Sequence, residues 1–289
     1  MKQITYLSIF MITFYISCGG GQKENGTTLA AANPTTRTIR FGLIPNTGGE
    51  WYNTNPKECL AFVAETGYSY LESVGALPGY DWEESREYVS SLGLKTVVMP
   101  TSVEAIVEAG PALKEDIQMA KNCEADYLVC YNWPLDRSMS TAEEWAVWAE
   151  DLNKAGQVCK ENGLTLIYHN HDKEFIPVEG KIPFEILMEV LDGKRVKMEL
   201  DVYWATKGGS DPVQLIKQYP DRIATLHMKD MHPETGDFED VGHGALNFPE
   251  IIKACENTSV EYFIVEHDRP ADPRSSIGRS GTYLKNLKI

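Results

Sequence analysis

Eight short runs of β-branched and aromatic residues recur along the chain from residue 38 onward. Many of them are separated by stretches whose apolar residues have helical spacing. Each run is followed by a turn-rich loop. The runs predicted to be strands are residues 38–44, 68–74, 95–99, 127–131, 164–168, 196–200, 223–228 and 262–265. The clearest helical stretches are residues 81–92, 141–162 and 184–191. Strands that alternate with helices predict parallel βαβ units, because parallel neighbours need a crossover connection.

The number of these units favours a closed barrel over an open sheet. Eight units fit within about 250 residues, the usual length of a (β/α)₈ barrel. An open doubly wound sheet usually carries a glycine-rich phosphate loop after its first strand. Here the first strand is followed by residues 45–49, PNTGG, which contain neither G-x-G-x-x-G nor G-K-[ST]. We therefore predict an α/β fold with a single TIM barrel over residues 38–289 and no second domain.

The expected helix ends carry their own signals. Thr141 followed by Glu144 forms a capping box, in which each side chain bonds to the backbone N–H of the other residue. Gly67, Gly93 and Gly163 lie just beyond expected helix ends, where a left-handed C-cap favours glycine. These signals support the same alternation of helices and strands.

The first 37 residues differ in character from the rest of the chain. Lys2 precedes an apolar stretch at residues 4–16, which is short for a bilayer span and typical of a signal peptide. Cys18 follows Ser17 and opens a polar, Gly-rich tract, an order that resembles a bacterial lipoprotein signal. We expect a lipoprotein-type signal peptide at residues 1–17, lipidation of Cys18 and a flexible linker at residues 18–37. A plain secretory signal cut near the same place is the alternative.

The expected location follows from this leader. The protein would be exported to the periplasm and would touch a membrane only through its N-terminal lipid anchor. The charge of the chain limits its possible partners. The 42 acidic residues outnumber the 27 basic ones and give a net charge of −15. Such a field repels phosphate groups, so it disfavours nucleic acid as a partner and a phosphorylated substrate. The expected partner is a small sugar or keto-sugar, and the oligomeric state stays open.

Metal-ligating residues gather at the ends of the last four predicted strands. The fifth run is followed by His169 and His171, the sixth by Asp201 and the eighth by Glu266, and the seventh contains His227. In a (β/α)₈ barrel these positions converge on one pocket. Carboxylates at close range repel one another, and a bound cation relieves that repulsion. The alternative is a salt-bridged polar plug in the barrel mouth.

The mixture of carboxylates and imidazoles suits a first-row divalent ion better than Ca²⁺. We therefore expect one divalent metal ion, of which Mn²⁺, Co²⁺ and Zn²⁺ are the main candidates.

Five segments carry a resemblance to a known family. They are residues 168–175 (YHNHDKEF), 199–204 (ELDVYW), 226–230 (LHMKD), 241–248 (VGHGALNF) and 263–268 (FIVEHD). In this order and spacing they resemble the sugar phosphate isomerase/epimerase family, which has a xylose isomerase-like TIM barrel. The resemblance extends from residue 38 to the C-terminus and does not identify a substrate.

The resemblance also implies a ligand set. In related epimerases the metal is held by Glu, Asp, His and Glu from strands five to eight, which implies Asp201, His227 and Glu266 here. The usual strand-five glutamate corresponds to Tyr168, so we expect a histidine to replace it. Alternation along a strand places His169 and His171 on the same side and leaves the choice open. We assign His171 to the metal and His169 to catalysis.

A metal that binds a carbonyl and an adjacent hydroxyl acidifies the C–H between them, because it stabilises the enediolate. The leading hypothesis is therefore a metal-dependent sugar isomerase or epimerase. A lyase or dehydratase of keto-sugars or keto-inositols shares the same intermediate and is the first alternative. The loss of the strand-five glutamate favours this lyase. A non-catalytic sugar-binding lipoprotein is the second alternative.

The remaining candidates fall into two groups. The expected catalytic residues are Glu72, His169, Lys229 and Glu266. The expected substrate contacts are Asn132, Trp133, Glu174 and Trp204.

Overall fold

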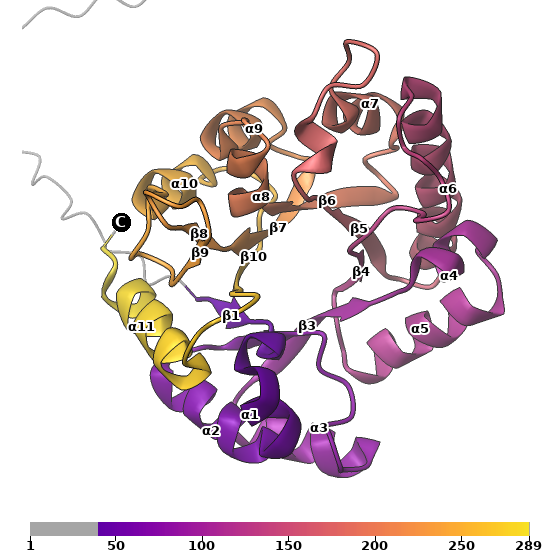
Figure 1. Ribbon diagram of the computed structural model, residues 1–289. Helices are drawn as coiled ribbons and strands as arrows, with labels where there is room; N and C mark the ends of the chain where they lie inside the picture. Colours follow the sequence, from indigo (N-terminus) through magenta and orange to yellow (C-terminus); the bar gives the residue numbers. More distant parts are fainter. Residues whose placement is uncertain (1–39, 289) are drawn as a thin grey trace, which may run out of the picture. The chain divides into compact units, whose positions relative to one another are not determined.

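The predicted strands close into a parallel barrel (Figure 1). The structure is a computed structural model and describes residues 40–288. The strands follow one another in the order β1-β10-β7-β6-β5-β4-β3-β2, and β2 pairs with β1 to complete the ring. The barrel strands are β1 (Gly42–Leu43), β2 (Tyr70–Glu72), β3 (Lys95–Pro100), β4 (Tyr127–Cys130), β5 (Thr165–His169), β6 (Val196–Asp201), β7 (Ile223–Met228) and β10 (Tyr262–Val265). The fold expected from the alternating pattern is therefore confirmed.

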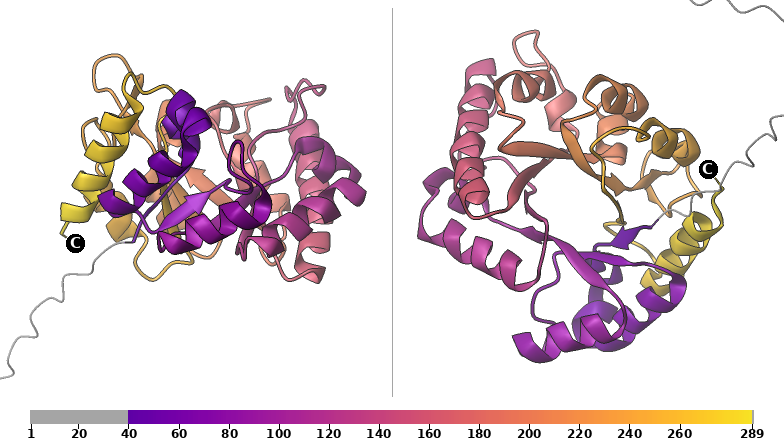
Figure 2. Two further views of the ribbon diagram at one scale, coloured as in Figure 1. Left: turned by 90° about the horizontal axis from the view of Figure 1, so that it is seen from below. Right: turned by 180° about the vertical axis from the view of Figure 1, so that it is seen from behind.

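Helices surround this ring, as Figure 2 shows from two further directions. They are α1 (Gly49–Thr54), α2 (Pro56–Thr66), α3 (Trp82–Ser91), α4 (Val103–Glu108), α5 (Pro111–Asn122), α6 (Ala142–Glu161), α7 (Pro183–Val190), α8 (Val202–Lys207), α9 (Pro212–Gln218), α10 (Phe248–Ala254) and α11 (Pro273–Asn286). Short 3₁₀ turns cover Pro45–Gly48 and Lys173–Phe175. The last helix, α11, packs beside α2, so the two ends of the barrel sequence lie next to each other (Figure 1).

A small hairpin is the main addition to the barrel. Strands β8 (Asp230–Met231) and β9 (Phe238–Glu239) pair antiparallel just after β7. Because β7 ends at the mouth, the hairpin lies at the same end as the candidate site.

The predicted helix ends are confirmed. Thr141 and Glu144 form both bonds of the capping box at the start of α6. Gly67, Gly93 and Gly163 all have positive φ, at 108°, 70° and 82°. L-residues with a side chain rarely adopt this conformation, so glycine is favoured at these three C-caps.

Two apolar layers hold the barrel together. The larger layer lies between the strands and the helices, and its most voluminous buried side chains include Trp145, Trp148 and Phe184. The smaller one includes Val129, Ile167, Ala224 and Ile264, with Tyr70 and Tyr262 packed against it. Tyr70 and Tyr262 begin their strands and meet edge to face at 4.8 Å. The N-terminal end of the barrel is therefore closed by tyrosine and aliphatic side chains.

The second strand is shorter than expected, at Tyr70–Glu72 in place of residues 68–74. Its register against β3 shifts between Leu71 and Glu72, and Ser73 then adopts a left-handed φ of 58°. This turn ends the strand immediately after Glu72. The first strand, β1, is also shorter than residues 38–44.

The expected signal peptide, Cys18 lipidation and linker lie outside the described residues. Across residues 40–288, no helix combines the length and the hydrophobicity needed to cross a bilayer.

Candidate metal and substrate site

Polar side chains fill the barrel at the C-terminal ends of β5, β6 and β7. His169, Asp201 and His227 end or nearly end these strands, and all three are buried. One potential ligand atom from each lies within 4.8 Å of the others. The structure thus brings together Asp201 and His227 as predicted, and of the two strand-five histidines it places His169 with them.

His227 lies at the centre of the cluster. Its Nδ1 atom is 3.0 Å from Glu266 Oε2, and its Nε2 atom is 2.8 Å from Glu72 Oε1. A second carboxylate oxygen, Glu199 Oε2, is 3.2 Å from Nε2. Burial lowers the pKa of His227, but Glu199, Glu72 and Glu266 outweigh it and hold the pKa well above its ordinary value.

Asp201 offers a free oxygen to the site. Its Oδ1 atom accepts a hydrogen bond from the backbone N–H of Trp204 and so caps α8. Its Oδ2 atom is buried without a hydrogen-bond partner, 3.8 Å from His169 Nε2. Burial raises the pKa of Asp201 to about 6. A buried carboxylate oxygen without a hydrogen-bond partner, near imidazole nitrogens and 3.4 Å from Lys229 Nζ, fits a divalent cation of the N/O-binding type.

Lys229 compensates the negative charge of the site. Its Nζ atom is 2.7 Å from Glu266 Oε2, 2.9 Å from Asp268 Oδ1 and 3.4 Å from Asp201 Oδ2. Burial lowers the pKa of Lys229, but the three carboxylates raise it by more than burial lowers it, so the ammonium form is favoured. Burial opposes ionisation of Glu266, yet Lys229 and His227 hold the pKa of Glu266 well below its ordinary value.

The placement of the usual strand-five glutamate at Tyr168 is wrong for the barrel interior. Tyr168 points outward, where its ring lies 6.0 Å from that of Trp148 in α6. Its hydroxyl donates to Glu174 Oε1 at 2.5 Å. Because side chains alternate along a strand, the inward position belongs to His169. The ring nitrogen Nδ1 of His169 lies 3.1 Å from Glu199 Oε2.

His171, the predicted ligand, lies further out, beyond the end of β5. Its ring is 5.0 Å from the ring of His169 and packs near Trp133 and Trp204, at 5.9 and 5.4 Å. Two groups of potential ligands are found among the described residues, His169 with Asp201 and His227, and Glu72 with Glu199 and His227, and His171 belongs to neither. Burial lowers the pKa of His171 to about 4, so the ring is neutral. The geometry favours His169 as the ligand and leaves His171 facing the pocket.

The pocket above this cluster has a volume of about 200 Å³. It is lined by Ile44, Asn46, Tyr131, His169, His171, Trp204, Lys229, Glu266 and Asp268. Lys229 is the only lysine or arginine of this lining, and it already contacts three carboxylates. A phosphate group would therefore find no free cation here.

Several predicted residues lie elsewhere. Glu174 is buried and accepts hydrogen bonds from Tyr168 Oη and the backbone N–H of His171, so it holds the loop and does not line the pocket. Glu72 lies beneath His227 and also does not line the pocket. Asn132 is exposed, and Trp133 touches the site only through His171. Trp204, Lys229 and Glu266 line the pocket as expected.

The sequence interpretation missed Glu199, Tyr131, Asp268 and Asn46. Glu199 stands two residues before Asp201, and period-two alternation places both on the inward face of β6. That signal was present in the sequence. Asn46 and Tyr131 follow short strands with no such pattern, and only the closed ring brings them to the pocket.

The motif VGHGALNF, residues 241–248, forms the loop that follows the hairpin and leads into α10. The Asp230 carboxylate accepts hydrogen bonds from the backbone N–H groups of Gly242, Gly244 and Leu246 at 2.9–3.1 Å. A Cβ atom at Gly244 would lie 2.4 Å from Asp230 Oδ1. Glycine is therefore required there by the close approach of the carboxylate, and the motif is structural.

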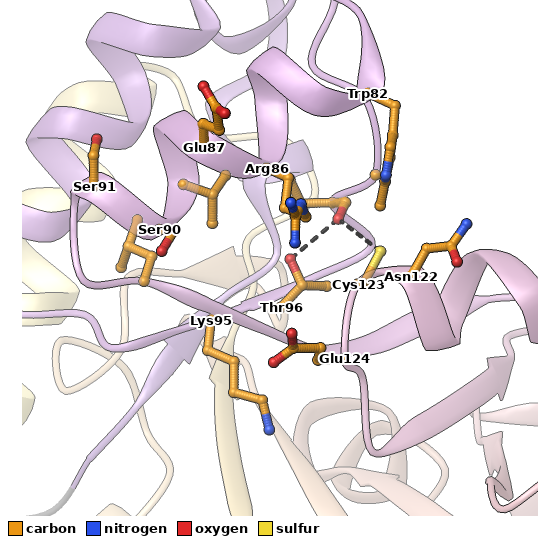
Figure 3. A pocket seen from close by; sticks show the side chains of 14 residues that line it. Trp82, Arg86, Glu87, Ser90, Ser91, Lys95, Thr96, Asn122, Cys123 and Glu124 are labelled. Atoms are coloured by element: carbon orange, nitrogen blue, oxygen red, sulfur yellow. Dashed lines mark hydrogen bonds between the residues drawn. The ribbon is translucent and has the colours of Figure 1, made fainter.

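A larger cavity, of about 450 Å³, lies outside the barrel between α3 and the end of α5 (Figure 3). Its charged side chains, Arg86, Glu87, Lys95 and Glu124, are all exposed. The Thr96 hydroxyl and the Cys123 thiol both point to the carbonyl oxygen of Val74 (Figure 3). No charged residue that lines this cavity is buried, in contrast to the lining of the barrel mouth.

Comparisons with known proteins identify the family of the chain. A family profile described as xylose isomerase-like TIM barrel matches residues 60–287. An inosose dehydratase of Geobacillus kaustophilus (strain HTA426) is 30% identical over 302 aligned positions, which cover 88% of this chain and 94% of that protein.

Solved structures show the same fold. A sugar phosphate isomerase/epimerase from Parabacteroides distasonis ATCC 8503 superposes with a TM-score of 0.75 at 24% identity, covering 88% of this chain and 96% of that one. The IOLI protein with a binding zinc atom has a TM-score of 0.67 at 17% identity, covering 86% and 98%.

Proposed function

Because the chain belongs to the xylose isomerase-like TIM barrel family, we propose that it is a metal-dependent lyase that removes water from a small, uncharged polyhydroxy ketone. A keto-inositol or keto-sugar is the substrate class. The name of the relative from Geobacillus kaustophilus supports the dehydratase reaction. The pocket of about 200 Å³ suits a single six-carbon ring or chain.

The observation that carries this proposal is the pair of imidazoles at the end of β5. In the epimerases that the sequence resembles, the glutamates of strands five and eight also move protons. Here the inward residue of β5 is His169, so Glu266 has no carboxylate partner on that strand. A neutral imidazole on one side and an ammonium group on the other are better suited to removing a proton and expelling a hydroxyl.

His169 Nε2, Asp201 Oδ2 and His227 Nδ1 would hold the cation, and Glu266 Oε2, 3.0 Å from His227 Nδ1, would complete the set. A divalent cation there would polarise the substrate carbonyl and stabilise negative charge on its oxygen. His171, neutral and facing the pocket, accepts the proton from the carbon next to the carbonyl.

The leaving hydroxyl needs a proton of its own. Asp268 faces the pocket beside Lys229, and burial together with Glu266 raises the pKa of Asp268. The Lys229 ammonium group donates a proton to the hydroxyl on the next carbon, which departs as water, and Asp268, 2.9 Å from Lys229 Nζ, holds the ammonium group in place. One C–H and one C–O bond break, a carbon–carbon double bond forms, and the net change is loss of one water.

The test is incubation of the protein, loaded with Mn²⁺, Co²⁺ or Zn²⁺, with keto-inositols and keto-sugars in D₂O. We expect a product lighter by one water, with deuterium exchange at the carbon next to the carbonyl in recovered substrate. Exchange with only isomeric products would contradict the lyase and support the isomerase. Tight binding without exchange would support a sugar-binding protein.

A sugar isomerase or epimerase is the second candidate. Lys229 and His227 favour the ionised form of Glu266, so Glu266 can accept a proton and return it to a neighbouring carbon. A matched pair of variants, Asp268→Asn and His171→Gln, separates the two reactions. Loss of Asp268 should slow dehydration more strongly than isomerisation, since only dehydration needs the ammonium group that Asp268 holds in place to protonate a leaving hydroxyl.

We also propose that the protein is exported and anchored through Cys18. The apolar stretch at residues 4–16 and the Ser17-Cys18 junction support this location. Cys18→Ser should move the protein from the membrane fraction to the soluble periplasmic fraction. Retention of the variant in the membrane fraction would contradict the lipid anchor.

A further inference from the structure

Two buried glutamates lie beneath the candidate ligands and take no part in the proposed proton transfers. Glu72 and Glu199 are both completely buried. Each follows a register shift in its strand, between Leu71 and Glu72 on β2 and between Met198 and Glu199 on β6. Such irregularities redirect side chains and are common beside active sites.

The backbone after Glu72 is strained as well. Ser73 is one of the few non-glycine residues of the described chain with positive φ, at 58°. A non-glycine residue in this region is strained and persists only where its surroundings hold it. The Ser73 hydroxyl lies 2.6 Å from Tyr131 Oη, and Tyr131 donates to Glu72 Oε1 at 2.5 Å. The strained turn therefore supports the position of the Glu72 carboxylate.

Both carboxylates contact the far side of the imidazoles. Glu72 Oε1 is 2.8 Å from His227 Nε2. Glu199 Oε2 is 3.2 Å from the same nitrogen and 3.1 Å from His169 Nδ1, and the Thr225 hydroxyl fixes its other oxygen at 2.8 Å. A carboxylate oxygen accepts hydrogen bonds, so the ring nitrogen that faces it carries the proton.

The opposite nitrogens also face carboxylates, but those of Glu266 and Asp201 lie at the mouth of the barrel, where a divalent cation would take the place of the hydrogen between nitrogen and oxygen. His227 Nδ1 faces Glu266 Oε2 at 3.0 Å, and His169 Nε2 faces Asp201 Oδ2 at 3.8 Å. Histidine ligands of metals are commonly oriented in this way by a carboxylate on their second nitrogen.

We propose that Glu72 and Glu199 are positioning residues that select Nδ1 of His227 and Nε2 of His169 as the cation-binding atoms. The sequence suggested Glu72 as a catalytic base. Its complete burial beneath His227 gives it no access to substrate and assigns it to this positioning role instead. The inference rests on the proposed function only in that a cation binds at the site.

The first test uses zinc, which is diamagnetic, and protein labelled with ¹⁵N-histidine. Two-bond ¹H–¹⁵N spectra of the zinc-loaded protein report which ring nitrogen is bound and which carries hydrogen. We expect His227 to bind through Nδ1 with hydrogen on Nε2, and His169 to bind through Nε2 with hydrogen on Nδ1. Binding of His227 through Nε2 would overturn the proposal, and so would failure to bind zinc.

Variants then separate positioning from general stability. Glu72→Met removes the acceptor and should weaken zinc binding about 10–100-fold, the usual effect of losing such a partner. It should also produce a second set of His227 signals. Glu72→Gln keeps an acceptor oxygen and should restore both the affinity and the single set. Glu199→Met should disturb the signals of both histidines.

A matched control comes from the surface of the barrel. Glu144→Met removes a carboxylate that accepts hydrogen bonds from the backbone N–H groups of Ser140 and Thr141 at the start of α6 and that, within the described residues, makes no hydrogen bond or ion pair with a histidine. It should lower the melting temperature without changing zinc affinity. Equal zinc affinity in Glu72→Met and the original protein would overturn the proposal. Loss of dehydratase activity with these spectra intact would refute only the proposed function.

Discussion

The two ends of the barrel interior contain different kinds of side chain, apolar at the N-terminal end and charged or polar at the C-terminal end. At the N-terminal end, Tyr70 and Tyr262 pack edge to face against an aliphatic layer that includes Ile264. At the C-terminal end, His169, His227 and several carboxylates share the same narrow space, and nearly all are buried. One strand contributes to both ends: on β10, Ile264 belongs to the apolar layer and Glu266 follows it at the mouth.

This difference separates stability from function. The apolar end is stabilised by burial and close packing, which do not depend on charge. The polar end pays desolvation for each buried charge and recovers it only through a complete set of partners. We therefore expect changes of apolar residues at the N-terminal end to act on folding and changes of the candidate ligands at the C-terminal end to act on cation binding.

The largest effect should come from His227→Ala. It removes a candidate ligand, so we expect metal content to fall below one ion per chain and activity to fall by roughly 1000-fold, about 4 kcal/mol in the barrier. Metal analysis and turnover assays measure both. A variant with full metal content and full activity would remove His227 from the site.

Ile264→Ala should have the next largest effect, on stability. Loss of a buried isoleucine side chain usually costs about 2–5 kcal/mol because a cavity remains. Urea unfolding measures the loss. Zinc affinity should stay close to that of the original protein, and a parallel fall in affinity would show that the two ends are not separable.

Glu174, at the C-terminal end, should make the free energy of unfolding depend on pH. Burial raises the pKa of Glu174 to about 7 from an ordinary value of 4.5, so the folded state favours the protonated form. Its contribution to stability is present below about pH 4.5 and is lost as the pH rises through 7. The shift corresponds to at most about 3 kcal/mol.

Unfolding free energies of the original protein and Glu174→Gln at pH 5 and pH 8 test this dependence. The original protein should lose more stability than the variant over this interval. Parallel pH profiles would mean that Glu174 is ionised throughout.

The smallest effect should come from Tyr262→Phe. The Tyr262 hydroxyl bonds to Asp126 at 2.7 Å near the surface, and its loss should cost about 1 kcal/mol or less. The ring stays in place, so the aromatic packing with Tyr70 is retained. A loss as large as that of Ile264→Ala would show that the hydroxyl, and not the ring, holds this end together.

Sequence pattern alone determined the barrel and most of its boundaries. The runs at residues 223–228 and 262–265 coincide with β7 and β10, and the capping box of α6 was recognised from Thr141 and Glu144. These features depend on neighbours within a few residues, where periodicity and capping act. The grouping of Asp201, His227 and Glu266 also followed, since parallel strands in a barrel present their ends to one mouth.

Only the tertiary structure decided which nitrogen, oxygen or ring faces which neighbour. It placed Tyr168 outward and His169 inward, and it buried Glu72 under His227. It also made Glu174 the hydrogen-bond acceptor that holds the loop after β5. The reason is that these roles depend on register. A shift of a single residue between β2 and β3, or between β6 and β7, redirects a side chain, and such shifts leave no mark in a local pattern.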